Sequence, residues 1–301
     1  MRVLNIWQVD VFTTRPLAGN PCAVILGAEG LPPETLQAVA REMNLSETVF
    51  LLPATDPNAS YRVRIFTPRS EIPFAGHPTI AAALVARDSG FASVLPGQQE
   101  LVQECGIGLV PVRGDDDQGH WRWTMTQRLR SFRVVEHAPA QVAHALGCPP
   151  EALAQTPASV VSTGIPWMIV ELTDLERLAS LQPRATELTA LYQSHGAVGL
   201  AAFTLGAGTP QCQLRLRAFP PSEGIDEDPV TGSANGCLGA HLQQTGRFGG
   251  ARFAYRAEQG VEIGRPGIID VAADYEAEDP VIRVGGAAVT LMWGQLHLPD
   301  D

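Results

Sequence analysis

An internal repetition that divides the 301 residues into two similar halves constrains the fold of this chain more than any other feature. Residues 19–26 read GNPCAVIL and residues 164–170 read GIPWMIV, so Gly, Pro and an apolar run align at an offset of 145. Residues 64–68 (RIFTP) and 217–221 (RAFPP) align Arg, Phe and Pro at an offset of 153. Offsets that rise slowly along the chain are typical of one old duplication with small insertions. Chance similarity of short apolar strings is the alternative explanation.

A third matching pair consists of two segments rich in small residues, which align at an offset of 156 when Gly76 is set on Gly232. Each half then has the same expected order: a strand after a Gly-Pro turn, an amphipathic helix, two strands, a Pro-rich loop and a Gly-opened helix. The expected helices are 33–43, 185–193, 77–87 and 233–244. The expected strands are 48–52, 199–205, 61–66, 213–219 and 288–298. We also expect a hairpin turn at 114–119 and a linker between the halves near 127–133.

Composition narrows the class of protein. Apolar residues make up 45% and charged residues 18%, as in an ordinary globular protein of about two domains. The net charge of −11 disfavours nucleic acid as a partner, and apolar runs such as 80–86 are much shorter than the ~18 residues of a membrane span. The amino terminus lacks a sustained apolar segment, which predicts a cytoplasmic protein, and the five cysteines form no CxxC pair.

Lysine does not occur in the sequence, because all 21 basic residues are arginine. This excludes Schiff-base enzymes and the phosphate-binding GK[ST] loop. No GxGxxG and no HExxH motif is present either. Cys237 and His241 lie one helical turn apart, but no third ligand is near in sequence, so we expect no metal and no organic cofactor.

Two loops that open helices carry most of the candidate chemistry. The first spans 71–79 and includes His77, and the second spans 227–236 and includes Asp228 and Ser233. A helix N-terminus offers backbone N–H groups and a partial positive charge, so two such ends facing each other would hold a small carboxylate. Ordinary helix capping by these polar residues is the alternative.

Glu47 is a glutamate that occurs in only one of the two repeated halves. It precedes an apolar strand, and the repeat sets a leucine at the corresponding position, Leu200. A carboxylate on one side only of a duplicated scaffold indicates an asymmetric functional site. A surface residue or a cap partner is the alternative interpretation.

Several segments together resemble one known family, the PhzF-like proteins (phenazine biosynthesis F). The resemblance covers nearly the whole chain in the right order and shows no departure at the two helix-opening loops. The segments are 9–13 (VDVFT), 19–21 (GNP), 46–48 (SET), 74–79 (FAGHPT), 227–234 (EDPVTGSA), 264–266 (GRP) and 284–286 (VGG).

The resemblance implies an α+β fold like that of diaminopimelate epimerase, with two pseudo-repeated domains, each a curled mixed sheet around a central helix, and the active site between them. We expect domains of 1–127 plus 288–301 and of 128–287. It also implies a cofactor-independent isomerase of the trans-2,3-dihydro-3-hydroxyanthranilate isomerase type, acting on a small carboxylate-bearing substrate, and a homodimer. The implied catalytic residues are Glu47 as acid/base, His77, Asp228 and Ser233; the implied substrate-binding residues are Asn20, Ser46, Gly76 and Gly232.

Two other functions remain open from the sequence. The related epimerases use a cysteine on each helix-opening loop, but here the loops carry Ala-Gly-His and Thr-Gly-Ser, so cysteine-based racemisation is disfavoured. Ser233, His77 and Asp228 would suit a serine hydrolase, although no GxSxG motif exists. A binding module that kept the fold and lost activity is the other alternative.

Overall fold

The computed structural model describes residues 1–92, 100–117, 120–136, 139–276 and 280–299. The chain has a mixed α+β fold and divides into two compact units. The first unit comprises Met1–Thr126 with Gly285–Asp301, and the second comprises Gln127–Val284. In the described residues, no helix combines the length and the apolar character that crossing a membrane requires.

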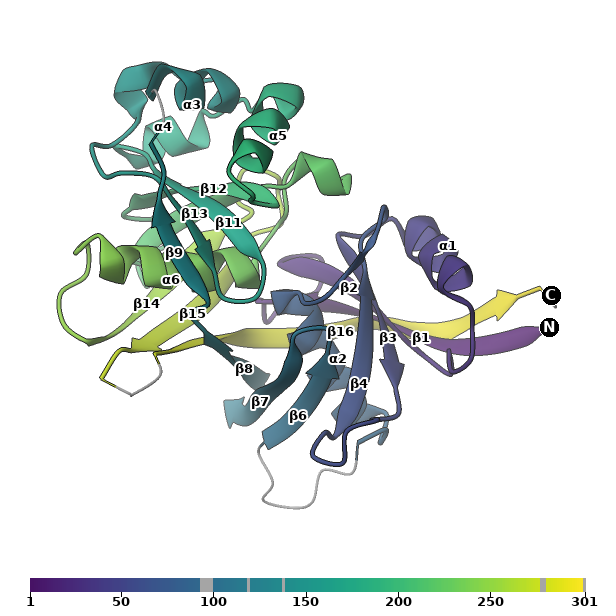
Figure 1. Cartoon of the computed structure of the whole chain (residues 1–301). Coiled ribbons are helices and arrows are strands. Elements are labelled where there is room, and N and C mark those ends of the chain that lie inside the picture. The colour runs from purple at the N-terminus through teal and green to yellow at the C-terminus, as the bar shows by residue number, and fades with distance from the viewer. Residues whose placement is uncertain (93–99, 118–119, 137–138, 277–279, 300–301) are drawn as a thin grey trace. The chain divides into compact units, whose positions relative to one another are not determined.

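The N-terminal unit is a ring of strands around a helix. Its elements are β1 (Arg2–Val11), β2 (Asn20–Leu26), α1 (Pro33–Met43), β3 (Glu47–Leu52), β4 (Tyr61–Phe66), β5 (Glu71–Ile72), α2 (Gly76–Asp88), β6 (Glu100–Cys105), β7 (Gly108–Asp117), β8 (His120–Arg128) and most of β16 (Val281–Leu298). The strand order is β1-β2-β3-β4-β6-β7-β8-β16, and β16 also pairs with β1, which closes the ring. Figure 1 shows β16, in yellow, running beside β1, in purple.

Helix α2 is the centre of this unit. It contacts six strands, β1, β2, β3, β4, β6 and β7, and every residue from Gly76 to Ala86 is buried. Alanine supplies much of this helix, and its small side chain lets strands approach the helix on several sides. The helix therefore has no polar face, in contrast to the amphipathic α1 on the outside of the ring.

The C-terminal unit repeats this plan. Its elements are β9 (Ser131–Val134), α3 (Pro139–Leu146), a 3₁₀ turn η1 (Pro150–Ala152), β10 (Ser159–Ser162), β11 (Pro166–Glu171), α4 (Leu175–Ala179), α5 (Ala185–Ser194), β12 (Gly199–Leu205), β13 (Leu214–Phe219), a 3₁₀ turn η2 (Pro221–Glu223), α6 (Gly232–Gln244), β14 (Arg252–Gln259) and β15 (Gly267–Asp274). Helix α6 is buried from Gly232 to Leu242 and contacts β10, β11 and β15.

The senses of strand pairing confirm the duplication. In the first unit β1–β2 is antiparallel, β2–β3 parallel, β3–β4 antiparallel, β4–β6 parallel and β6–β7 antiparallel. The second unit gives the same series for β10–β11, β11–β12, β12–β13, β13–β14 and β14–β15. Five matching senses in the same order are not expected from chance similarity of apolar strings, so the predicted pseudo-repeated α+β fold is confirmed.

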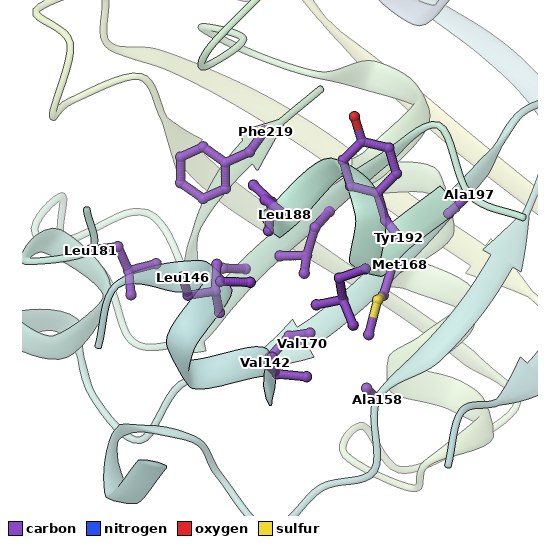
Figure 2. Close-up of a cluster of buried hydrophobic side chains, with 14 of the residues drawn as sticks. Val142, Leu146, Ala158, Met168, Val170, Leu181, Leu188, Tyr192, Ala197 and Phe219 are labelled. Carbon is purple, nitrogen blue, oxygen red and sulfur yellow. The ribbon is translucent and has the colours of Figure 1, made fainter. Parts of the chain in front are cut away.

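A large apolar cluster holds the outer helices of the C-terminal unit to its sheet. Figure 2 shows side chains from α3, α5 and β11, among them Leu146, Met168 and Leu188, converging on one another. Leu188 and Leu146 are fully buried, and Phe219 from β13 packs at the same cluster. Burial of this much apolar surface fixes the start of α5 relative to β12 and β13, the strands that lead toward the second helix-opening loop.

Most sequence-predicted elements agree with the structure, and three differ. Helix 33–43 and strands 61–66 and 199–205 have the predicted bounds. The predicted turn at 114–119 is wrong at its start, because Gly114 to Asp117 continue β7, and 118–119 lie outside the described residues.

The predicted linker near 127–133 begins where the chain passes from the first unit to the second, but its residues fall mostly in β8 and β9, with only Leu129 and Arg130 between these strands. The final strand starts at Val281, seven residues before its predicted start, and its portion from Ala288 to Leu298 pairs along β1. A chain that passes directly from one strand to the next gives no Gly- or Pro-rich signal for a boundary.

Candidate active site

Glu47 is the first residue of β3 in the N-terminal unit. It pairs in parallel register with Cys22 of β2, at the end of the strand where the chain arrives from α1. Asn44, with φ of 50°, ends α1 in the left-handed conformation, and the buried Ser46 then leads into the strand. The carboxylate is therefore held on the rigid end of a central strand, and its side chain is only 14% exposed.

The imidazole of His77 lies beside this carboxylate. His77 Nε2 is 3.3 Å from Glu47 Oε2, and the His77 side chain is 3% exposed. Its other nitrogen, Nδ1, is 3.0 Å from the amide nitrogen of Asn20, which is fully buried. With Asn20 Nδ2 donating to Nδ1, a neutral His77 carries its proton on Nε2, the nitrogen that faces Glu47. Three residues from three elements thus form the series Asn20, His77, Glu47, in which the first two are buried and Glu47 is partly buried.

The backbone before Asn20 explains how this residue reaches its place. Gly19 has φ of +64°, and a Cβ there would lie 2.2 Å from the carbonyl oxygen of Val11. Only glycine permits this close turn. The buried carboxylate of Asp10 accepts a hydrogen bond from Leu17 N at 2.7 Å, which fixes the same turn from its other end.

Cysteine chemistry is disfavoured in both units. Burial, followed by the nearby negative charge of Glu47, raises the pKa of the Cys22 thiol well above its usual value. In α6, burial raises the pKa of Cys237 to about 11, and its Sγ lies 3.1 Å from the carbonyl oxygen of Val161. Both thiols stay protonated at neutral pH, so neither is ready to act as a base.

The second helix-opening loop is anchored to β13. Asp228 N donates to Ala218 O at 2.9 Å, and the neighbouring Glu227 receives two hydrogen bonds from Arg217, at 2.9 and 2.7 Å. The two side chains of this ion pair are 7% and 10% exposed. A buried bidentate pair of this kind is rigid, because loss of either partner leaves an uncompensated charge. The loop therefore has one fixed path before α6 begins.

Asp228 itself is 4% exposed, and Thr231 Oγ1 donates to its Oδ2 at 2.5 Å. Thr231 is the N-cap residue of α6, although its side chain makes no capping hydrogen bond to the helix. The hydroxyl is directed to Asp228 instead. The hydroxyl of this N-cap residue therefore binds the Asp228 carboxylate and not the end of the helix.

Ser233 lies in the first turn of α6 and is oriented by a tryptophan. The indole Nε1 of Trp167 donates to Ser233 Oγ at 3.0 Å, and both residues are buried. Gly199 makes room for that indole, because a Cβ there would lie 2.5 Å from a Trp167 ring carbon. An oxygen that accepts from an indole N–H keeps its own proton to donate. Ser233 is thus prepared to donate a hydrogen bond to an acceptor.

The predicted site residues occupy two sets, one in each unit. Glu47, His77 and Asn20 come together in the first unit, with Ser46 and Gly76 adjacent in sequence; Asp228, Gly232 and Ser233 lie at the start of α6 in the second. Sequence reasoning assigned no role to Trp167 or Thr231, although both stand inside the matched segments.

Comparison with known proteins gives consistent matches over the whole chain. A family model described as phenazine biosynthesis-like protein (PhzC-PhzF) matches residues 9–294. The trans-2,3-dihydro-3-hydroxyanthranilate isomerase of Pseudomonas fluorescens is 34% identical over 98% of this chain and 99% of that protein. An uncharacterized isomerase of Clostridium acetobutylicum is 33% identical over 99% of each. The crystal structure of a PhzF-family phenazine biosynthesis protein from Bacillus anthracis has a TM-score of 0.88 and 27% identity, covering 99% of this chain and 100% of that one.

Proposed function

Since the chain belongs to the PhzC-PhzF family of phenazine biosynthesis-like proteins and is an isomerase, we propose that it moves a proton within a small carboxylate-bearing ring or amino-acid-like substrate, with Glu47 as the acid/base. The observation that carries this proposal is the series of Asn20, His77 and Glu47. Its carboxylate sits on a strand end and has a proton donor beside it.

In the proposed reaction Glu47 first takes a proton from one carbon of the substrate. The electron pair left behind shifts through the adjacent double bond, and the protonated Glu47 returns the proton to a different carbon. Atoms and charge balance within substrate and enzyme, so one positioned base is enough. His77, with Nε2 directed at Glu47, would hold the orientation of this carboxyl group through both steps.

We assign substrate binding to the residues of the second unit. Ser233 keeps a hydroxyl proton to donate, which suits a substrate carboxylate or carbonyl oxygen. Asp228 is an acceptor and suits an amino or hydroxyl group. The backbone at Gly76 and Gly232 opens the two buried helices, where the positive helix end favours an anion. This division predicts a substrate that carries both an acidic and a donor group.

The proposed chemistry is independent of cofactors. A proton shift needs no electron acceptor, and the sequence has no lysine for a Schiff base. Dialysis against a chelator should therefore leave the rate of a proton-shift assay unchanged. Loss of activity on chelation, restored by one added metal, would contradict this part of the proposal.

The test is turnover of trans-2,3-dihydro-3-hydroxyanthranilate, the substrate named for the Pseudomonas fluorescens relative, followed by absorbance and by NMR in heavy water. Glu47→Gln keeps the size of the side chain and cannot accept a proton, so kcat should fall by ~10²–10⁴-fold. Glu34→Gln, at an exposed glutamate in the first turn of α1, is the matched control and should keep full activity. Undiminished turnover by Glu47→Gln would refute the assigned base.

The serine hydrolase alternative is not favoured. A nucleophilic serine needs a base to take its proton. The partner of Ser233 Oγ within the described part of its unit is the indole N–H of Trp167, which is a donor and not a base. Labelling of Ser233 by a fluorophosphonate probe would reopen this alternative.

A further inference from the structure

Gln259, the last residue of β14, lies outside both helix-opening loops in the sequence. It is fully buried against the second of these loops. Its side-chain amide makes four hydrogen bonds. Nε2 donates to Asp228 O at 2.9 Å and to Thr231 Oγ1 at 3.0 Å. Oε1 accepts from Thr231 N at 3.0 Å and from Asn235 Nδ2 at 3.1 Å. Both N–H donors and both acceptor lone pairs of this amide therefore bind the second helix-opening loop and the first turn of α6.

The partners of Gln259 leave a single orientation for its amide. Oε1 faces two N–H groups and Nε2 faces two oxygens, so rotation of the amide by 180° would set donors against donors. The orientation of this amide also sets the direction of the hydrogen bond between Thr231 and Asp228. Thr231 Oγ1 accepts from Gln259, so its one proton points to Asp228 Oδ2, 2.5 Å away. Donation thus runs in one direction, from Gln259 through Thr231 to Asp228.

The backbone turn after residue 259 holds this residue close to the second helix-opening loop. Gly260 follows it with φ of +78°, and a Cβ there would lie 2.7 Å from Pro229 O and 2.3 Å from Arg265 O. The chain after β14 therefore turns directly against the residue that follows Asp228. Asn235, also fully buried, donates to Thr231 O at 3.0 Å, which ties the first turn of α6 to the same amide.

We propose that Gln259 and Thr231 are positioning residues for the isomerase reaction, forming a hydrogen-bond relay that fixes the rotation of the Asp228 carboxylate. This rests on the proposed role of Asp228 in binding substrate. Neither residue touches substrate; both act through Asp228. A hydrogen bond to a charged group is stronger than one between neutral groups, and the relay is polarised in one direction because each member donates to the next. It keeps Oδ2 engaged with Thr231, so the carboxylate meets a substrate donor in one defined rotation.

The test compares Thr231→Val, which removes only the hydroxyl, with Thr231→Ser, which retains it. Thr204→Val is the matched control, because Thr204 is a buried threonine of the same unit whose hydroxyl donates to the backbone oxygen of Leu205. We expect kcat/KM on trans-2,3-dihydro-3-hydroxyanthranilate to fall about tenfold in Thr231→Val, mainly through a higher KM. It should be nearly unchanged in Thr231→Ser and in Thr204→Val. A decrease in Thr231→Ser equal to that in Thr231→Val would overturn the relay.

A double-mutant cycle separates the relay from a merely structural role. If Thr231 acts through the carboxylate, Thr231→Val should cost less than about twofold in an Asp228→Asn background. A full tenfold cost in both backgrounds means that Thr231 only supports the fold, and the relay is wrong. If Asp228→Asn alone keeps full activity, the proposed role of Asp228 fails instead. A loss in Asp228→Asn with none in Thr231→Val removes the relay and leaves the proposed function intact.

A second measurement does not depend on turnover. In crystal structures of Thr231→Val and Gln259→Leu, the Asp228 carboxylate should rotate away from its wild-type position, while Thr204→Val should leave it in place. An unchanged Asp228 side chain in both variants would overturn the relay even if the tested substrate is not turned over.

Discussion

His241 is buried in a neutral form at the C-terminal end of α6, and this burial should make the stability of the protein depend on pH. The side chain is fully buried; its Nδ1 lies 2.7 Å from Ser159 Oγ, and the ring of Phe203 packs edge-on against it at 5.6 Å. Burial, and then the positive charge of Arg247, lower the pKa of His241 from 6.5 to about 4. Both effects disfavour the imidazolium form.

The sign of the effect follows from proton binding. The unfolded chain takes up a proton at His241 near pH 6.5, and the folded chain does so only near pH 4. The unfolded state therefore binds more protons between these values, so this contribution to stability is fully present above about pH 6.5 and is lost as pH falls toward 4. A difference of about 2.5 pKa units at about 1.4 kcal/mol per unit gives a total loss of about 3.5 kcal/mol.

The assay is urea denaturation at pH 7.5 and pH 4.5 for the wild type and for His241→Asn. Asparagine can still hydrogen-bond to Ser159 at the position of Nδ1, but it does not titrate in this range. Other groups titrate in both proteins and cancel in the comparison. On acidification the wild type should lose about 2 to 3 kcal/mol more than the variant. Equal losses in the two proteins would show that His241 is not buried neutral, and would refute the reasoning.

Three further predictions concern packing, backbone and assembly. Leu188→Ala in the fully buried cluster of the C-terminal unit should cost about 3 kcal/mol in the free energy of unfolding by urea denaturation, and a cost below 1 kcal/mol would contradict the packing described. Gly19→Ala should lower both stability and kcat, because its Cβ would collide with Val11 O and displace Asn20; full activity and an unchanged urea midpoint would argue against the turn. We expect a homodimer, so sedimentation should give twice the mass of one chain, and a monomer at micromolar concentration would count against it.

The sequence predicted the scaffold well because the duplication repeats a pattern that local chemistry enforces. Alternating burial in β4, with Tyr61 and Val63 inside and Arg62 and Arg64 outward, is visible as an alternation of residue types. The alanine-rich α2 is recognisable by its small residues for the same reason. The start of β16 was predicted too late, because Gly285 and Gly286, which are poor strand formers, interrupt the first part of this strand.

In the candidate site too, local sequence motifs could be recognised and long-range contacts could not. Glu47, His77 and Asp228 stand in dense local motifs, so the sequence alone made them candidates. The contacts that orient them are long-range: Gln259 lies 28 residues after Thr231, and Trp167 lies 66 residues before Ser233. A lone Gln at the end of a strand resembles any solvent-facing residue until the fold shows that it is buried.

The ring of the N-terminal unit has a consequence for biosynthesis. Strand β1 leaves the ribosome first, and its neighbour β16 is made only after the whole C-terminal unit. At about 5–20 residues per second, β1 waits on the order of tens of seconds for that partner. During this interval the nascent chain exposes the unpaired edges of β1 and β8, the kind of surface on which chains aggregate. The unit that is translated first is thus the last to be completed, and its folding yield in the cell should depend on chaperones that shield those two strands.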